Sequence, residues 1–204
     1  MWKLTLCAVG IVALLTGALL YRRWHLRWGA TDDEVAAPMP GDDLLVNAPF
    51  LATRAISIGA PAALVWPWIV QIGYGRAGFY SYDLLDNLGR PSADRILPEW
   101  QTLEVGAIAA PMANPPTKRN SFRVVGFEAD RWLLWAKPDS TWAWKLAPTE
   151  AGGTRLVVRL KAMDKFPQLL FSAPLMEIAD FPMMRRQLLG IKARAENWAR
   201  ELTP

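Results

Sequence analysis

The chain has 204 residues, which is enough for one domain of ordinary size. Its formal net charge is +4, but residues 1–28 hold four of the 23 Lys and Arg residues and none of the 19 Asp and Glu residues. The rest of the chain therefore carries 19 charges of each sign. Because the basic excess belongs to the N-terminal segment, we do not expect nucleic-acid binding by the domain.

Cysteine and histidine are almost absent. The single Cys excludes an internal disulfide, and the single His, His25, stands beside the N-terminal segment. No His-rich or Cys-rich cluster is present that would bind a metal, and no nucleophile stands out. We expect no metal and no cofactor, and we assign no catalytic residue.

The N-terminal segment is strongly apolar. Eighteen residues from Leu4 to Tyr21 carry no charge, and as a helix they would be about 27 Å long, close to the apolar thickness of a bilayer. Trp2 precedes the run, and Trp24 and Trp28 follow it, where aromatic rings favour the headgroup region. This pattern predicts one transmembrane helix. A cleaved signal peptide is the alternative, but no small residues suited to cleavage end the run.

The flanking charges predict an orientation and a domain division. Lys3 precedes the helix, whereas Arg22, Arg23 and Arg27 follow it, so the positive-inside rule places the domain in the cytoplasm. We expect a membrane anchor at 1–28, a linker at 29–49 and a folded domain at 50–204. Within the linker, Thr31-Asp32-Asp33-Glu34 predicts a capping box that opens a short helix.

The domain begins with a strand and two helical segments. Residues 53–58 alternate as a strand, and Gly59-Ala60-Pro61 then turns the chain into a helix that contains Pro67. A second short helix is predicted over 82–88, with Ser81 as its cap and Gly89 at its end.

The rest of the domain changes to a period of two and then returns to helix. Strands are predicted over 122–127, 131–136, 141–146 and 155–162. In the last strand, Leu156, Val158, Leu160 and Ala162 share one face, which indicates a half-buried antiparallel sheet. An apolar stripe from Met184 to Leu202 predicts a long C-terminal helix beginning near Asp180, after a separate segment at 169–179.

Four short motifs fall in this order of elements. They are Ala60-Pro61 with Val65-Trp66, the block from Gly78 to Asp83, the block from Ala93 to Trp100, and Leu189-Gly190-Ile191-Lys192. Over about residues 50–201 the chain resembles the SRPBCC superfamily, which includes START-type lipid carriers and polyketide cyclases. Within it the chain is similar to an uncharacterised bacterial branch that often carries an N-terminal membrane helix.

The resemblance implies an α+β helix-grip fold, in which a curved antiparallel sheet surrounds a long C-terminal helix, here preceded by one transmembrane helix. It implies a cavity for an apolar ligand but no particular reaction, because the superfamily shares no universal catalytic residues. Aromatic and polar residues near the implied cavity are the candidate ligand-binding residues. These are Trp66, Trp68, Tyr80, Tyr82, Asp94, Arg95, Glu99, Trp100, Trp142 and Trp144.

Two further patterns favour structural roles. Gly73-Tyr74-Gly75-Arg76-Ala77-Gly78 matches the letters of a dinucleotide fingerprint, but a helix precedes it and antiparallel strands follow, so these glycines predict a turn. Asp83 and Asp86 are spaced to share a helix face, as paired acid and base groups would. The stronger interpretation is that Asp83 suits the helix dipole and Asp86 is solvated.

The sequence therefore predicts a single-pass membrane protein whose domain binds a hydrophobic small molecule or lipid. One alternative is a cyclase or dehydratase that uses the same cavity. It would move protons with Tyr80, Tyr82, Asp94, Arg95 or Glu99, and it requires a carboxyl group inside the cavity with a perturbed pKa. Another is a scaffolding protein with a collapsed cavity. The ligand and the oligomeric state do not follow from the sequence.

Overall fold

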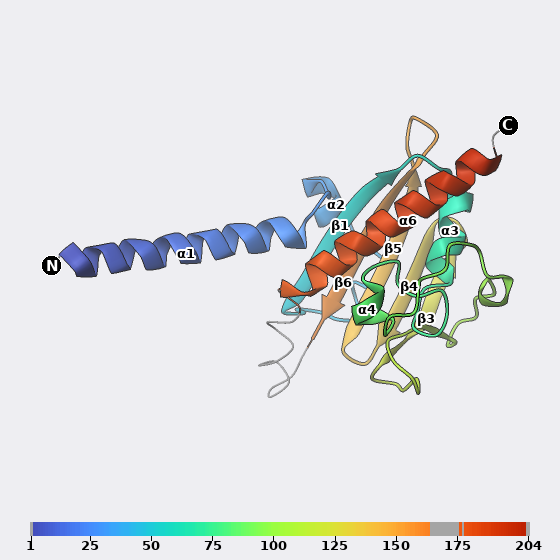
Figure 1. Ribbon diagram of the computed structural model, residues 1–204, viewed down its shortest axis with the longest axis horizontal. Helices are drawn as coiled ribbons and strands as arrows, with labels where there is room; N and C mark the ends of the chain where they lie inside the picture. The colour runs from blue at the N-terminus through green and yellow to red at the C-terminus, as the bar shows by residue number, and fades with distance from the viewer. Residues whose placement is uncertain (1, 164–175, 177, 203–204) are drawn as a thin grey trace.

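A computed structural model describes residues 2–163, 176 and 178–202. A six-stranded antiparallel sheet is crossed on one face by a long helix (Figure 1). The strand order is β1-β6-β5-β4-β3-β2. The strands are β1 (Phe50–Ile58), β2 (Ile108–Pro111), β3 (Ser121–Glu128), β4 (Trp132–Lys137), β5 (Ser140–Pro148) and β6 (Thr154–Ala162).

The helices occupy the two ends of the chain and the connection after β1. They are α1 (Trp2–Leu26), α2 (Asp32–Ala36), α3 (Ala62–Val70), α4 (Asp83–Asp86), the 3-10 turn η1 (Pro98–Trp100) and the long α6 (Asp180–Leu202). The helix-grip architecture is thus present: a sheet, a long C-terminal helix on one face, and two short helices after the first strand.

The predicted strands are confirmed to within a few residues. The edge strand β2 is short and was not predicted, because the Ile-Ala-Ala-Pro segment has too little alternation to indicate a strand. The predicted segment at 169–179 lies almost entirely outside the described residues. The predicted turn at 73–78 is confirmed, since Gly73 and Gly78 bridge each other and both have positive φ angles.

The predicted transmembrane anchor is wrong. Across the residues that the structure describes, no helix is both long and apolar enough to cross a membrane. The helix α1 does cover the apolar run, but its C-terminal turns carry Arg22, Arg23 and His25, and His25 and Leu26 are buried in the domain. The transmembrane helix in the predicted fold class is therefore wrong. The predicted single-pass membrane localisation is wrong for the same reason.

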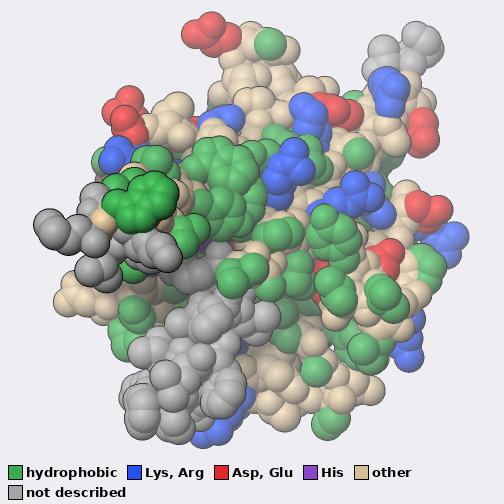
Figure 2. Space-filling view, turned by 60° about the vertical axis from the view of Figure 1, so that its left-hand side comes forward, with side chains coloured by type: hydrophobic (Ala, Val, Ile, Leu, Met, Phe, Trp, Pro, Cys, Tyr) green, Lys and Arg blue, Asp and Glu red, His purple; other side chains and the backbone are tan. Residues whose placement is uncertain are grey.

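The helix α1 extends away from the body in Figure 1, and many of its apolar side chains are exposed. Figure 2 shows the side toward which it projects, where hydrophobic side chains gather with Lys and Arg side chains among them. Its base is fixed to the domain by ring contacts, with Trp24 and Phe181 of α6 4.9 Å apart. Arg54 of β1 also donates from Nε to the carbonyl of His25 at 2.8 Å.

The face of the sheet opposite α6 is covered by residues of the segment before β1. The capping box at Thr31 forms as predicted and opens α2. The guanidinium of Arg159 on β6 donates to the carbonyls of Glu34 and Val35 within α2, to that of Ala37 just after it, and to the Asp42 carboxylate at 2.6 Å. The polar row of β6 thus fastens part of the 29–49 segment to the sheet.

Candidate functional site

A cavity of about 340 Å³ lies between the sheet and the N-terminal half of α6. The sheet supplies one wall, the loop after α3 and the helix α4 supply a second, and α6 supplies the third. The described residues that line it are Phe79, Ser81, Asp86, Met112, Phe122, Lys137, Ser140, Trp142, Leu160, Ala162, Met176, Ala179, Asp180, Met183, Met184 and Gln187.

Most of this lining consists of apolar side chains, and several of them are flexible. Four methionines, Met112, Met176, Met183 and Met184, contribute to it together with aromatic rings such as Phe122 and Trp142. Methionine side chains are unbranched and polarizable, so they adapt to ligands of different shapes. Cavities of this size with apolar walls and a few polar groups are typical of small-molecule sites.

A close approach at Gly190 fixes the position of α6 over the cavity. A Cβ added at Gly190 would lie 2.3 Å from the carbonyl oxygen of Tyr80. Tyr80 itself has φ 58°, a strained conformation for a residue with a side chain, in the turn that faces α6. The predicted Leu189-Gly190-Ile191-Lys192 motif therefore lets α6 rest directly on this turn.

Asp86 is the unexpected member of the lining. Both of its carboxylate oxygens are buried, and neither has a hydrogen-bond partner among the described residues. Burial raises the pKa of Asp86 to about 6; the nearby Ser81 hydroxyl opposes this rise and the negative charge of Asp83 adds to it. The interpretation of Asp86 as a solvated carboxylate is therefore wrong.

Two buried donors line the same cavity. Gln187 on α6 is 2% exposed and Trp142 on β5 is 5% exposed. Neither Gln187 Nε2 nor Trp142 Nε1 has an acceptor in the part of the chain that the structure describes. Gln187 was not predicted, although its spacing carried a signal: it falls between Met184 and Leu188 on the apolar stripe of α6.

The other charged groups in the lining have partners. Lys137 pairs with Asp139 beside it. Asp180, the first residue of α6, pairs with the buried Arg54 at 2.6 Å. Asp86 is thus the carboxylate that the described lining leaves without an ion-pair partner.

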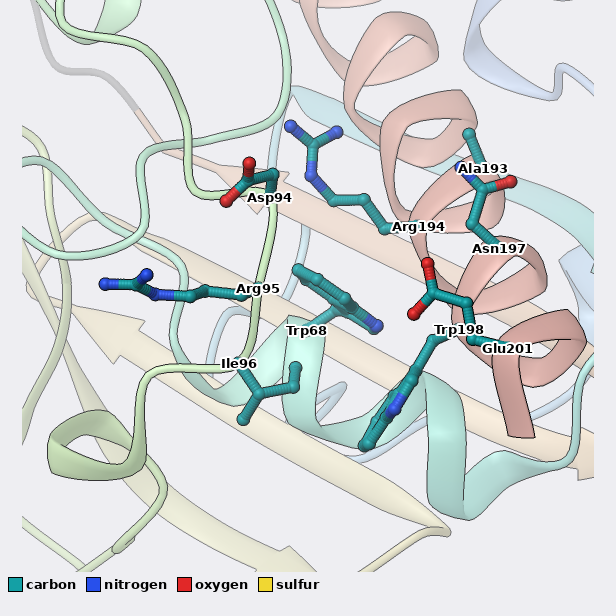
Figure 3. A pocket seen from close by; sticks show the side chains of 9 residues that line it. All are labelled: Trp68, Asp94, Arg95, Ile96, Ala193, Arg194, Asn197, Trp198 and Glu201. Carbon is teal, nitrogen blue, oxygen red and sulfur yellow. The ribbon is translucent and has the colours of Figure 1, made fainter.

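A second hollow, of about 590 Å³, opens beside the C-terminal half of α6 (Figure 3). It brings together three predicted residues, Trp68, Asp94 and Arg95, with α6 residues that were not predicted. Its full lining is Trp68, Asp94, Arg95, Ile96, Ala193, Arg194, Asn197, Trp198 and Glu201.

Most polar groups of this hollow are exposed to solvent or already make contacts within the protein. Asp94 and Arg95 are exposed, no ion pair joins them, and Figure 3 shows Arg95 extending away from α6. Arg194 donates from Nε to the carbonyl of Ala93 at 2.8 Å and stacks over the Tyr80 ring at 4.5 Å. The surface hollow is larger than the interior cavity but offers fewer unsatisfied buried groups.

The remaining candidate residues do not converge on one site. Trp66, Tyr80 and Trp144 are buried in the core, and Trp144 packs against Trp142 with ring centres 5.0 Å apart. Tyr82 and Glu99 are exposed, and they line neither the interior cavity nor the surface hollow. Among all ten candidates, only Trp142 lines the interior cavity.

A buried glutamine explains the predicted Ala93–Trp100 block. Gln71, which is fully buried, donates to the Tyr80 hydroxyl at 2.8 Å and to the carbonyl of Arg95 at 3.1 Å, and it accepts from the amide of Leu97 at 2.9 Å. The ring of Trp100 lies under the guanidinium of Arg76 at 4.6 Å. These contacts fix a loop and give the block a structural role.

The described residues contain no cluster of His, Cys, Asp or Glu side chains that could hold a metal ion. In the lining of the interior cavity, the Asp86 carboxyl can accept hydrogen bonds or exchange a proton, and Gln187 and Trp142 can donate hydrogen bonds.

No family model and no curated protein matches the chain. Solved structures do match, among them a protein from Nitrosomonas europaea with 17% identity, a TM-score of 0.48, and coverage of 76% of this chain and 99% of that one. The Aha1 dimer from Colwellia psychrerythraea matches with 12% identity, a TM-score of 0.43, and coverage of 72% and 96%.

A Polyketide_cyc-like protein from Corynebacterium glutamicum also matches, with 19% identity, a TM-score of 0.35, and coverage of 74% of this chain and 90% of that one. At these identities and TM-scores the likenesses carry no argument about function, which must come from the site itself.

Proposed function

We propose that this protein binds an apolar or amphipathic small molecule in the interior cavity between the sheet and α6. The observation that supports this most strongly is the combination of an apolar, methionine-rich lining with three buried polar groups that lack partners among the described residues. Unsatisfied buried polar groups are costly in a folded protein, and a bound molecule offers them partners.

The scaffolding alternative is less well supported. It predicts that the protein's own side chains fill the space under α6, whereas the described residues leave about 340 Å³ there. An apolar space of that size is typical of a small-molecule site, which favours an occupant over a scaffold.

The test is to measure what the purified protein carries. Native mass spectrometry and solvent extraction should recover a co-purified apolar molecule from the wild type. Ala162→Phe and Ala179→Phe place a ring inside the cavity and should lose that molecule. The matched control is Ala193→Phe, which obstructs the surface hollow and should retain it. An empty wild-type protein that also fails to take up added apolar probes would refute the proposal.

One observation favours an enzyme as the second candidate. A cyclase or dehydratase needs a carboxyl group with a perturbed pKa inside the cavity, and Asp86 meets that requirement. None of the predicted proton-transfer candidates lines the cavity; these are Tyr80, Tyr82, Asp94, Arg95 and Glu99. Proton transfer would therefore fall to Asp86, with Gln187 placed to donate to a carbonyl oxygen.

Deuterium exchange tests this second candidate. With 2-nonanone in deuterated water, the Asp86 carboxylate would remove a proton from the α-carbon, and the enolate would take up a deuteron in its place. NMR should then show α-deuteration by the wild type and much slower exchange by Asp86→Asn. Equal exchange rates for the two proteins would exclude Asp86 as the proton-transfer group.

A further inference from the structure

The polar groups of the cavity form a matched set of one acceptor and two donors. Asp86 supplies carboxylate oxygens, whereas Gln187 Nε2 and Trp142 Nε1 supply N–H groups. All of these atoms are buried, and none has a partner within the described part of the chain. A buried donor or acceptor left unpaired costs the full desolvation of that group, so the pattern carries information about what the cavity holds.

Asp86 and Gln187 reach the cavity from adjoining elements. The hydroxyl of Ser81, close to Asp86, donates to the carbonyl of Met183 on α6 at 3.0 Å. Gln187 lies four residues after Met183 and therefore one turn further along the same face of α6. The Ser81–Met183 hydrogen bond thus joins the segment that carries Asp86 to the face that carries Gln187.

The helix α4 exposes its apolar side chains and partly buries its acidic ones, which is the reverse of an ordinary surface helix. Its leucines point outward, with Leu84 77% and Leu85 68% exposed, while both of its aspartates are partly buried. Asp83 has a structural reason for this, because it accepts from the amide of Ser92 at 3.0 Å and from the Ser92 hydroxyl. Asp86 has no such partner, and its inward position is left for a ligand to explain.

The neighbouring charges do not neutralise Asp86. Lys137 is engaged by Asp139, and Asp180 is engaged by Arg54. The closest charged group on α4, Asp83, is also negative and disfavours a second negative charge. Because no charged group of the described residues neutralises Asp86, an occupant of the cavity can supply the group that meets it.

We propose that the occupant of this cavity carries, at its polar end, an uncharged group that both donates and accepts hydrogen bonds, most simply an alcohol hydroxyl. The hydroxyl would donate to Asp86 and accept from Gln187, with Trp142 as a second donor. This inference rests on the proposed function. An ammonium group would leave the donors of Gln187 and Trp142 without an acceptor, and a carboxylate or ketone would set an acceptor against Asp86.

The experiment compares probes with one alkyl chain and different ends. The purified protein is titrated at pH 8 with 1-nonanol, its methyl ether, nonylamine and nonanoate, using calorimetry or tryptophan fluorescence. We expect 1-nonanol to bind about tenfold more tightly than the ether, because the ether cannot donate to Asp86. Tighter binding of the amine than of the alcohol, or equal binding of alcohol and ether, would overturn the inference.

Variants assign the preference to the two side chains. Asp86→Leu should remove the preference for the alcohol over the ether, whereas Asp86→Asn should keep most of it, because an amide also accepts from a hydroxyl. Gln187→Met keeps the length of the side chain and should weaken alcohol binding several-fold. Asp94→Leu in the surface hollow is the control and should change nothing. An unaltered preference in both Asp86→Leu and Gln187→Met would also overturn the inference.

The outcomes separate this inference from the proposed function. Binding of all four probes without preference, abolished by Ala162→Phe, keeps the proposed function and refutes the hydroxyl. Absence of binding by every probe refutes both. Thermal unfolding of each variant verifies that it is folded before its affinity is compared.

Discussion

The interior cavity and the surface hollow lie along the same helix, α6, but differ in how their polar groups are used. The hollow is the larger, about 590 Å³ against 340 Å³, and it holds more of the residues that the sequence indicated. Its charged groups are exposed or bound to backbone carbonyls. The cavity is lined mainly by apolar side chains, and the polar groups of Asp86, Gln187 and Trp142 in its wall are buried without partners among the described residues.

The difference shows that volume is a poor guide to a binding site. A polar side chain at the surface is satisfied by water, so its presence in a hollow requires no ligand. A polar side chain inside an apolar cavity has given up water and gained nothing in return. The smaller space is therefore the better candidate, and the following variants test that choice.

The largest effect is expected at the ion pair that holds the start of α6. Arg54 is 1% exposed, and Arg54→Met would remove the ion pair that it makes with Asp180 in the cavity wall. We expect the free energy of unfolding to fall by about 3–5 kcal/mol, measured by chemical denaturation. The double variant Arg54→Met/Asp180→Leu should lose less, because no charge is left uncompensated; an equal loss would contradict this account.

Gly190→Ala should affect both spaces, since each depends on the position of α6. The new Cβ would meet the Tyr80 carbonyl at 2.3 Å, so the helix must shift. We expect a loss of about 2–3 kcal/mol in the free energy of unfolding and weaker binding in the cavity. Gly17→Ala is the control, because a Cβ there meets nothing within 4 Å. A stable Gly190→Ala protein would mean that α6 is not held by this approach.

The variant Asp86→Asn tests the interior cavity through the pH dependence of the free energy of unfolding. The pKa of Asp86 is raised from 3.8 to about 6, so the folded state binds more protons between these values and the free energy of unfolding falls as the pH rises through them. The partners of Asp83, Lys137 and Asp180, which are Ser92, Asp139 and Arg54, are unchanged in the variant.

In ligand-free protein, Asp86→Asn should therefore be more stable than the wild type above pH 6 and equal to it below pH 4. Both carboxylate oxygens are buried but the residue as a whole is only partly buried, so we expect a gain of only about 1 kcal/mol. Denaturation curves at pH 4 and pH 8 measure it. A gain of the same size at both values would mean that the charge of Asp86 is not the cause.

The smallest effect is expected in the surface hollow. Asp94 and Arg95 are exposed and make no ion pair with each other, so Asp94→Asn and Arg95→Gln should each change the free energy of unfolding by less than about 0.5 kcal/mol. Binding of 1-nonanol should also be unchanged. A clear loss of affinity in either variant would move the ligand site from the cavity to the hollow.

Much of the fold could be predicted because its patterns are local. The alternation in 155–162, the capping box at Thr31 and the apolar stripe of α6 each depend on neighbouring residues alone. The cover over the outer face of the sheet was not predicted. Arg159 and Lys161 look solvent-facing in sequence, and only the fold places the 29–49 segment against them.

The site was harder to predict because its decisive property is the absence of a partner. Asp83 and Asp86 are the same residue type, three positions apart, yet Ser92 satisfies one and no described residue satisfies the other. The prediction that the aromatic residues line the binding site failed for a related reason. Trp66, Tyr80 and Trp144 resemble cavity-lining residues in composition, but their rings fill the core. Of the site residues that were missed, Gln187 is the one that the sequence could have indicated, because it is a polar residue on the apolar stripe of α6.

The most direct test of the cavity is a titration followed at the methionine methyl groups. Four methionines line it, Met112, Met176, Met183 and Met184, whereas Met39 packs on the opposite face of the sheet. With ¹³C-methyl methionine, addition of 1-nonanol should shift the signals of the lining methionines and leave that of Met39 unchanged. If the lining signals stay in place under saturating probe, or if Met39 moves with them, the interior cavity is not the binding site.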